Sequence, residues 1–203
     1  MRRLTQVALA LFALAPVAAH AQVEDRSAVR LQEEVGSLAA PDLATLSRDA
    51  HVILVGRFVN AKAELKDSPP DPDGFSAIRL ITTLRFELVE VIKGDARLSL
   101  ATKEGVVEID DGGNGEYRLV PKREILKAST QSQQFTPGRT YVIYGEWWDR
   151  WDSYLLMYNT ATAIDVTDDV AKPLRDSAMA RPFAGKPSEA VLREIREKAK
   201  ASK

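Results

Sequence analysis

The chain contains no cysteine among its 203 residues. Disulfide bonds, a thiolate nucleophile and cysteine metal ligands are therefore all excluded. A domain without such covalent links must be stabilised by its hydrophobic core alone, and a chain of this length can bury enough apolar surface to do so.

Histidine is almost as scarce, with two residues, His20 and His51. A histidine-rich zinc site is therefore excluded. A Ser-His-Asp triad would have to use His51, and the sequence contains no nucleophile-elbow motif to accompany it. A lone histidine can act as a general base. We instead expect His51 to be an edge residue whose ring is satisfied by local hydrogen bonds.

The chain also lacks a surplus of one charge and a long hydrophobic run. Its 28 lysine and arginine residues nearly balance 29 aspartate and glutamate residues, which gives no support for a nucleic-acid partner. The apolar run from Val7 to Val17 is shorter than the ~20 residues that a membrane-spanning helix needs, and Pro16 interrupts it. We therefore expect no membrane span.

The N-terminal segment has the pattern of a secretory signal peptide. Arg2 and Arg3 precede the apolar run, and Ala19-His20-Ala21 matches the small-x-small site that signal peptidase cleaves. We predict that residues 1–21 are removed after Ala21 and that the protein is exported, to the periplasm or the medium. Residues 22–40 would then form an N-terminal arm or a short helix.

The residues from Ala77 to Asp95 form the longest strand-like stretch, and its apolar phase changes along the way. Ile78, Leu80, Leu84, Phe86 and Leu88 occupy even positions, whereas Val89 and Val91 occupy odd ones. Because alternate side chains of a strand point to opposite faces, such a change indicates a bulge or a bend. A bent strand of this kind is typical of small closed barrels.

Other strands are predicted on both sides of this one. A continuously apolar segment begins at Val52 and includes Gly56, and further strands are expected at 98–109, 117–126, 141–146 and 153–166. A short helical turn follows Asp42, its expected N-cap. The last helix starts near Ser188 and presents a stripe of Val191, Leu192 and Ile195.

This pattern predicts a mainly β protein with terminal helices, built as an OB-fold-like antiparallel β-barrel. A small β-sandwich is the alternative. We expect the barrel to occupy residues 41–166, with residues 167–203 forming a loop and a C-terminal helix packed on it.

Three segments carry a resemblance to a known family. They are Gly56 within its strand, Val89 to Gly94 (VEVIKG), and the Pro137-Gly138 turn that leads into YVIY. Their order resembles the netrin-like modules, which include the tissue inhibitors of metalloproteinases, and it is similar to cysteine-free exported bacterial proteins of this layout. The resemblance implies an OB-like barrel with packed helices. The inhibitors act through an N-terminal cysteine that this chain lacks, so no functional residue is carried over.

Two acidic turns offer oxygen ligands for calcium, one at Asp71 and Asp73 and one from Asp110 to Glu116. Carboxylates in an exported protein can bind calcium. Neither turn has the EF-hand spacing, and aspartate and glycine are ordinary turn residues. We therefore predict no metal and no cofactor.

An aromatic hairpin is the most distinctive feature of the sequence. All three tryptophans and four of the five tyrosines fall between residues 141 and 158. Exposed aromatic side chains flanked by polar groups mark recognition surfaces. The candidate binding residues are Trp147, Trp148, Arg150, Trp151 and Tyr154. In the alternative, the tryptophans pack back on the barrel or on the terminal helix.

These observations predict an exported, non-enzymatic binding module whose partner is a protein or an envelope component. A carbohydrate-binding module using Trp147 to Trp151, with an envelope glycan as ligand, is the alternative. A third hypothesis is an enzyme that uses Asp110, Asp111 or Glu116, and it requires a pocket in which two carboxylates converge.

Overall fold

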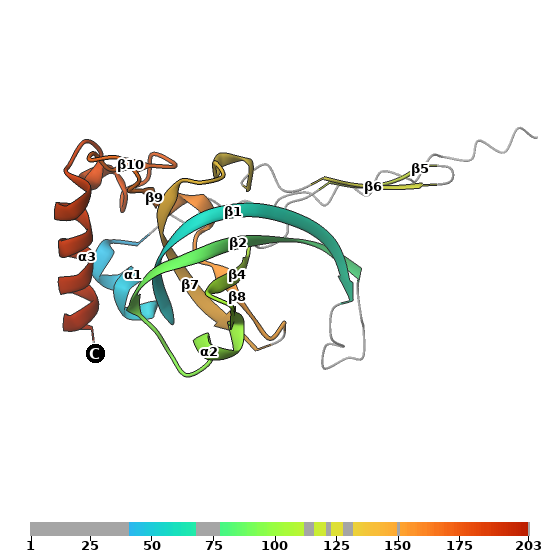
Figure 1. The fold of residues 1–203 in the computed structure, drawn as a ribbon, viewed down its shortest axis with the longest axis horizontal. Coiled ribbons are helices and arrows are strands. Elements are labelled where there is room, and N and C mark those ends of the chain that lie inside the picture. The colour runs from blue at the N-terminus through green and yellow to red at the C-terminus, as the bar shows by residue number, and fades with distance from the viewer. Residues whose placement is uncertain are drawn as a thin grey trace, which may run out of the picture.

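The computed structural model describes residues 41–67, 78–111, 116–120, 123–127, 132–149 and 151–202. Its centre is a closed five-stranded barrel (Figure 1). The barrel strands are β1 (Val52–Asp67), β2 (Ile78–Lys93), β4 (Val106–Asp110), β7 (Thr140–Trp148) and β8 (Ser153–Leu156). The predicted signal peptide, the arm at 22–40 and the turn at 71–73 lie outside the described residues.

The strands follow the order β1-β2-β4-β8-β7, and β7 pairs with β1 to close the barrel. Every neighbouring pair is antiparallel except β4 and β8, which run parallel. The prediction of an OB-fold-like barrel is confirmed, with this one parallel pair as a difference from a purely antiparallel barrel.

The predicted irregularity in β2 is present at Val89. Val55 pairs with Glu90 and Gly56 pairs with Leu88, so Val89 has no partner in the ladder. Before this point Phe86 faces the barrel interior, and after it Ile92 packs on the helical side. The predicted bulge is therefore present and turns β2 from one layer to the other. Val89 and Val91, whose odd positions indicated it, are 57% and 44% exposed, so Ile92 and not these two residues packs on the helical side.

The first half of β1 is buried on both faces because it separates two hydrophobic clusters. Val52 and Leu54 face the barrel interior, whereas Ile53 and Val55 face the terminal helices. The barrel interior contains Val52, Leu54, Phe58, Leu84, Phe86, Val107, Ile109, Phe135, Tyr141, Ile143, Tyr154, Leu156 and Ala163.

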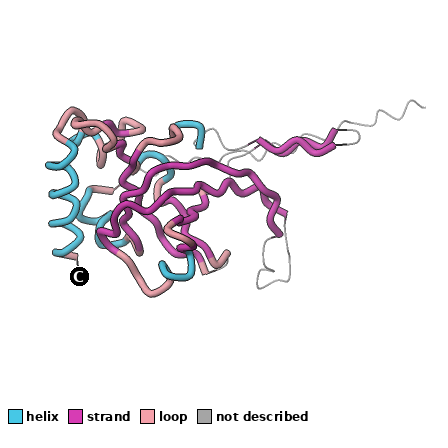
Figure 2. Tube along the Cα trace, in the orientation of Figure 1, coloured by secondary structure: helices cyan, strands magenta, loops and turns pink. Residues whose placement is uncertain are grey.

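Two helices cover the outer cluster: α1 (Leu43–Asp49) and α3 (Ser188–Ala201), which pack against each other (Figures 1 and 2). Asp42 caps α1 as predicted, and its carboxylate accepts the Thr45 N–H at 2.9 Å. The α3 stripe of Val191, Leu192 and Ile195 is buried. None of the helices in the described part of the chain has the length and apolarity needed to cross a membrane.

Three predicted strands were wrong in part. The strand expected at 117–126 is two strands, β5 (Glu116–Val120) and β6 (Arg123–Lys127), which pair with each other. Residues 98–109 are not one strand: α2 (Leu98–Ala101), β3 (Thr102–Lys103) and a turn with positive φ at Glu104 and Gly105 precede β4. Asp95 forms a local turn just before this helix, because its carboxylate accepts the Arg97 N–H at 3.0 Å.

The return strand at 153–166 is also interrupted. It stops at Leu156, and Tyr158 and Asn159 adopt left-handed backbone conformations. A 3-10 turn, η2 (Asn159–Ala161), carries the chain to β9 (Ile164–Asp165), which pairs with the opposite end of β7. Residues 153–166 thus pair with both ends of β7, through β8 at one end and β9 at the other.

The remaining elements are short. β10 (Lys172–Pro173) pairs with β9, and β5 (Glu116–Val120) pairs with β6 (Arg123–Lys127) in a separate two-stranded sheet. Two further 3-10 turns are η1 (Ser132–Gln134) and η3 (Arg181–Phe183).

Candidate functional site

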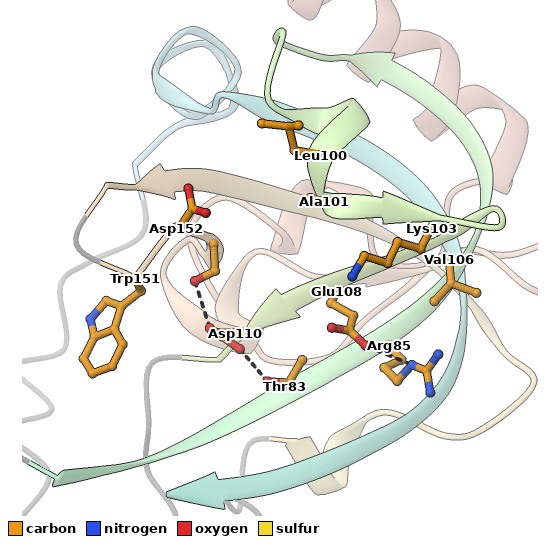
Figure 3. Close-up of a pocket in the computed structure, with 11 residues that line it drawn as sticks. Thr83, Arg85, Leu100, Ala101, Lys103, Val106, Glu108, Asp110, Trp151 and Asp152 are labelled. Carbon is orange, nitrogen blue, oxygen red and sulfur yellow. Dashed lines mark hydrogen bonds and ion pairs between the residues drawn. The ribbon is translucent and has the colours of Figure 1, made fainter. Parts of the chain in front are cut away.

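A pocket of about 270 Å³ lies on the outer face of β2 and β4, between α2 with β3 on one side and the β7–β8 turn on the other (Figure 3). Because Val107 and Ile109 fill the barrel, Glu108 and Asp110 point outward on alternate positions of β4. Thr83 and Arg85 reach the same face from β2.

The base of the pocket is organised by Asp110, whose exposed fraction is 5%. Thr83 Oγ1 donates to one carboxylate oxygen at 2.6 Å, and Ser153 Oγ donates to the other at 2.9 Å (Figure 3). These bonds join β2, β4 and β8 where the parallel pair closes the barrel. Hydrogen bonds to an ionised group are stronger than neutral ones, so the base is a pre-formed acidic surface.

The other acidic side chain on this strand face is Glu108, which pairs with Arg85 at 3.2 Å. Asp111, the next residue after Asp110, is also buried but does not line the pocket. Of the carboxylates named in the enzyme hypothesis, only Asp110 therefore lines this pocket among the described side chains.

Trp147 belongs to the framework of the hairpin. Its ring lies edge-on to Tyr154 with centroids 5.0 Å apart, and the Arg97 guanidinium lies 5.4 Å from its centroid. Arg97 also pairs with Asp149 at 3.3 Å, which ties α2 to the β7–β8 turn. The α2 wall and the hairpin wall of the pocket are therefore held in a fixed relation.

His51 forms a hydrogen bond to β7, the strand that carries Trp147. The Trp147 backbone N–H donates to His51 Nδ1 at 2.6 Å. The prediction that local hydrogen bonds satisfy His51 is wrong, because the partner of Nδ1 lies across the β1–β7 ladder and is distant in sequence.

Trp148 and Trp151 form the accessible part of the hairpin, with ring centroids 6.1 Å apart. Trp148 is 37% exposed, and Trp151 lines the pocket (Figure 3). The Trp151 Nε1–H is buried and has no acceptor among the described residues. These two side chains, rather than the whole aromatic cluster, are available to a ligand.

Tyr154 was wrongly predicted as a surface residue. Its exposed fraction is 0%, because β8 alternation turns it into the barrel interior, and its hydroxyl donates to Asp95. Burial, with a further contribution from Asp95, raises the pKa of the phenol, so it stays protonated. Arg150 lies outside the described residues.

Sequence reasoning missed most of the pocket walls, including Thr83, Arg85, Lys103, Glu108 and Asp110 as a group. The alternation of polar residues on β2 and β4 was a usable signal for their outward direction. The pairing of β4 with β2 on one side and β8 on the other could not be inferred from that alternation.

In the described part of the chain, no three acidic or histidine side chains are grouped to hold a metal ion. The chain matches no model of a known protein family, and it has no significant similarity to a curated protein.

Proposed function

We propose that this protein is an exported, non-enzymatic binding module whose ligand, a protein or another envelope component, occupies the pocket on β2 and β4. The observation that supports this function is the position of the pocket under the tryptophan-containing turn. In OB-folds, ligands bind on the face of the second and third barrel strands and under the loop joining the last two. Here those elements are β2, β4 and the β7–β8 turn.

The rigidity of the walls supports binding without a large rearrangement. Asp110 is fixed by two hydroxyl groups, and Arg97 fixes α2 against Trp147 and Asp149. A pre-formed site loses less conformational entropy when a ligand binds. The netrin-like resemblance adds a proposed family for the barrel but no functional residue.

A carbohydrate is the second candidate ligand. Trp151 lines the same pocket as Ser153, Asp110 and Asp152, so one aromatic side chain and several polar groups share this site. An aromatic wall with a few convergent polar groups is typical of small-ligand sites, and OB-folds bind oligosaccharides on this face.

A comparative pull-down from envelope extract tests the proposal. The bait proteins are the parent chain, Trp151→Ala, and Val170→Ser as a surface control away from the pocket. We expect a component that the parent and control retain and Trp151→Ala loses. Equal capture by all three baits would place binding elsewhere and contradict the site.

A glycan array with the same three proteins, followed by titration of tryptophan fluorescence, tests the carbohydrate alternative. Glycan binding that depends on Trp151 would favour it. The absence of any fluorescence response to envelope glycans would remove it and leave the protein or peptide ligand.

A further inference from the structure

Two charged side chains that line the pocket have no ion-pair partner among the described residues. They are Lys103 on β3 and Asp152 in the β7–β8 turn. The other charges of the pocket are engaged within the protein: Arg85 pairs with Glu108, and Asp110 accepts two hydroxyl hydrogen bonds. Lys103 and Asp152 are thus the charges that a ligand can reach without breaking an internal contact.

These two residues lie on opposite sides of the pocket (Figure 3). Lys103 comes from the side of α2 and β3, and Asp152 comes from the side of the tryptophan turn. The pocket therefore has a positive end and a negative end, although its total charge is close to balance. Opposite charges held apart in this way complement a ligand whose own charges are separated.

The negative end has a defined geometry. Asp152 has φ of 50°, a left-handed conformation that the turn imposes, and the turn is closed by a hydrogen bond from Trp151 N to Trp148 O at 3.0 Å. Asp152 and Trp151 therefore line the same end of the pocket, although their side chains point in different directions (Figure 3). An ammonium group at this end would meet a carboxylate and an aromatic side chain, both of which attract cations.

Desolvation decides between a neutral ligand and a charged one. Lys103 and Asp152 are both exposed in the free protein. A ligand that covers them removes part of their water, and a neutral ligand supplies no charge to replace it. A ligand with an ammonium and a carboxylate replaces the lost water at both ends. Charge complementarity therefore favours a zwitterion over a neutral sugar.

We propose that the pocket binds a short zwitterionic peptide, with its ammonium at Asp152 and Trp151 and its carboxylate at Lys103. This inference rests on the proposed function and names the ligand class of the same site. A pocket of about 270 Å³ suits a ligand of a few residues, and each extended residue adds about 3.5 Å between the two charges.

The test is a titration of the purified protein with alanine peptides of one to three residues, each in four forms: free, N-acetylated, C-amidated and doubly capped. Binding is followed by the NMR resonance of the Trp151 indole N–H, and affinity is measured by calorimetry. We expect the free peptide of optimal length to shift this resonance. Each cap should weaken binding by about tenfold or more, because it removes one charge-assisted contact.

Two substitutions test the two ends of the pocket separately. In Lys103→Met, amidation should no longer weaken binding, whereas acetylation still does. In Asp152→Asn, the reverse should hold, and asparagine tolerates the left-handed conformation. Lys200→Met and Asp169→Asn, matched changes at exposed positions away from the pocket, should leave both effects intact.

The outcomes also separate this inference from the proposed function. If a doubly capped peptide or a neutral oligosaccharide shifts the Trp151 resonance as strongly as the free peptide, the zwitterion inference is wrong and the binding site stands. If neither peptides nor envelope extract shifts the resonance, the binding function of the pocket is also wrong.

Discussion

Tyr144 and Tyr154 have the same side chain in two different environments. The Tyr144 ring is fully buried against the terminal helices, and its hydroxyl has no hydrogen-bond partner among the described residues. Burial, with a smaller effect of Glu194, raises its pKa. The Tyr154 hydroxyl instead donates to Asp95, which forms the local turn just before α2.

The same substitution should therefore have opposite effects at these two positions. Tyr144→Phe removes a buried polar atom without a partner and should raise the free energy of unfolding by about 1 kcal/mol. Tyr154→Phe removes one of the two donors to Asp95, the other being the Arg97 N–H, and should lower the free energy of unfolding by about 1–3 kcal/mol. Urea denaturation of both variants checks this, and effects of the same sign would contradict it.

The tryptophans should also differ in their contribution to stability. Trp147→Ala removes a ring that packs on Tyr154 and under Arg97, and should cost about 2–3 kcal/mol, somewhat less than for a fully buried ring. Trp148→Ala, at a more exposed ring, should change stability by less than about 1 kcal/mol. Thermal unfolding of each variant measures the difference; equal losses would place Trp148 in the framework too.

At the scale of elements, a bidentate ion pair connects α3 to β2. Arg196 donates to both carboxylate oxygens of Glu90, at 2.8 and 2.7 Å, and each side chain is 34% exposed. These hydrogen bonds, more than the opposing desolvation, lower the pKa of Glu90. The folded state therefore gains stability from the ionised carboxylate above its ordinary pKa and loses it as the pH falls through the lowered value.

Glu90→Gln should thus be less stable than the parent chain at pH 7, by up to about 1 kcal/mol because solvent screens the pair. The difference should shrink to zero as the pH falls below the lowered pKa of Glu90. Denaturation curves at a series of pH values measure it. Glu87→Gln, in the more exposed pair with Arg57, is the control with a smaller effect. A difference that stays constant down to pH 3 would contradict this role of the pair.

The β1–β7 contact that closes the barrel depends on a glycine. Gly145 lies opposite Val52, and a Cβ at residue 145 would lie 2.8 Å from Val52 Cγ2. Gly145→Ala should cost about 1–3 kcal/mol through overpacking. Val52→Ala removes the atom that clashes, so the double variant should be more stable than the sum of the two single effects predicts.

Gly56 provides the matched control for this cycle. A Cβ there would lie 2.9 Å from Phe86 Cβ, an atom that alanine retains. Phe86→Ala should therefore not rescue Gly56→Ala. Unfolding free energies of both cycles test the argument, and simple additivity at Gly145 and Val52 would refute it.

The elements differ in how far their sequences determine them. The cap at Asp42, the bulge at Val89 and the left-handed turn at Gly138 follow from local rules, and all three are present. The chain after Leu156 could not be predicted locally, because β9 pairs with the far end of β7. The pocket also could be predicted only in part. The aromatic hairpin that forms one wall is evident in the sequence, but the opposite wall depends on long-range strand pairing.

At the scale of the whole molecule, β1 makes the barrel and the helical layer interdependent. Ile53 and Val55 pack toward the helices, while the residues between and beside them fill the barrel. Loss of the helical layer would expose one entire face of this strand. We therefore expect the two layers to unfold together.

Ile195→Asp tests this expectation, because it places a charge in the buried stripe of α3. The cost of an unpaired buried charge is several kcal/mol, comparable with the total stability of a domain. Helical circular dichroism and tryptophan fluorescence should be lost in one transition at lower temperature. Arg193→Asp, on the exposed side of α3, should cost no more than about 1 kcal/mol. Barrel fluorescence that persists after the helix melts would show independent layers.

The length of β1 has a consequence for behaviour in concentrated solution. The strand pairs with β7 only as far as Arg57, while its other edge stays paired with β2 to Asp67. Beyond Arg57, no strand among the described residues pairs with this edge of β1, although β6 contacts the strand, and an unpaired edge is a template for strand addition. Lys62 and Glu64 form an ion pair along this edge, and charged side chains there oppose such addition. We therefore expect uncharged replacements of Lys62 and Glu64 to increase self-association of the protein in concentrated solution.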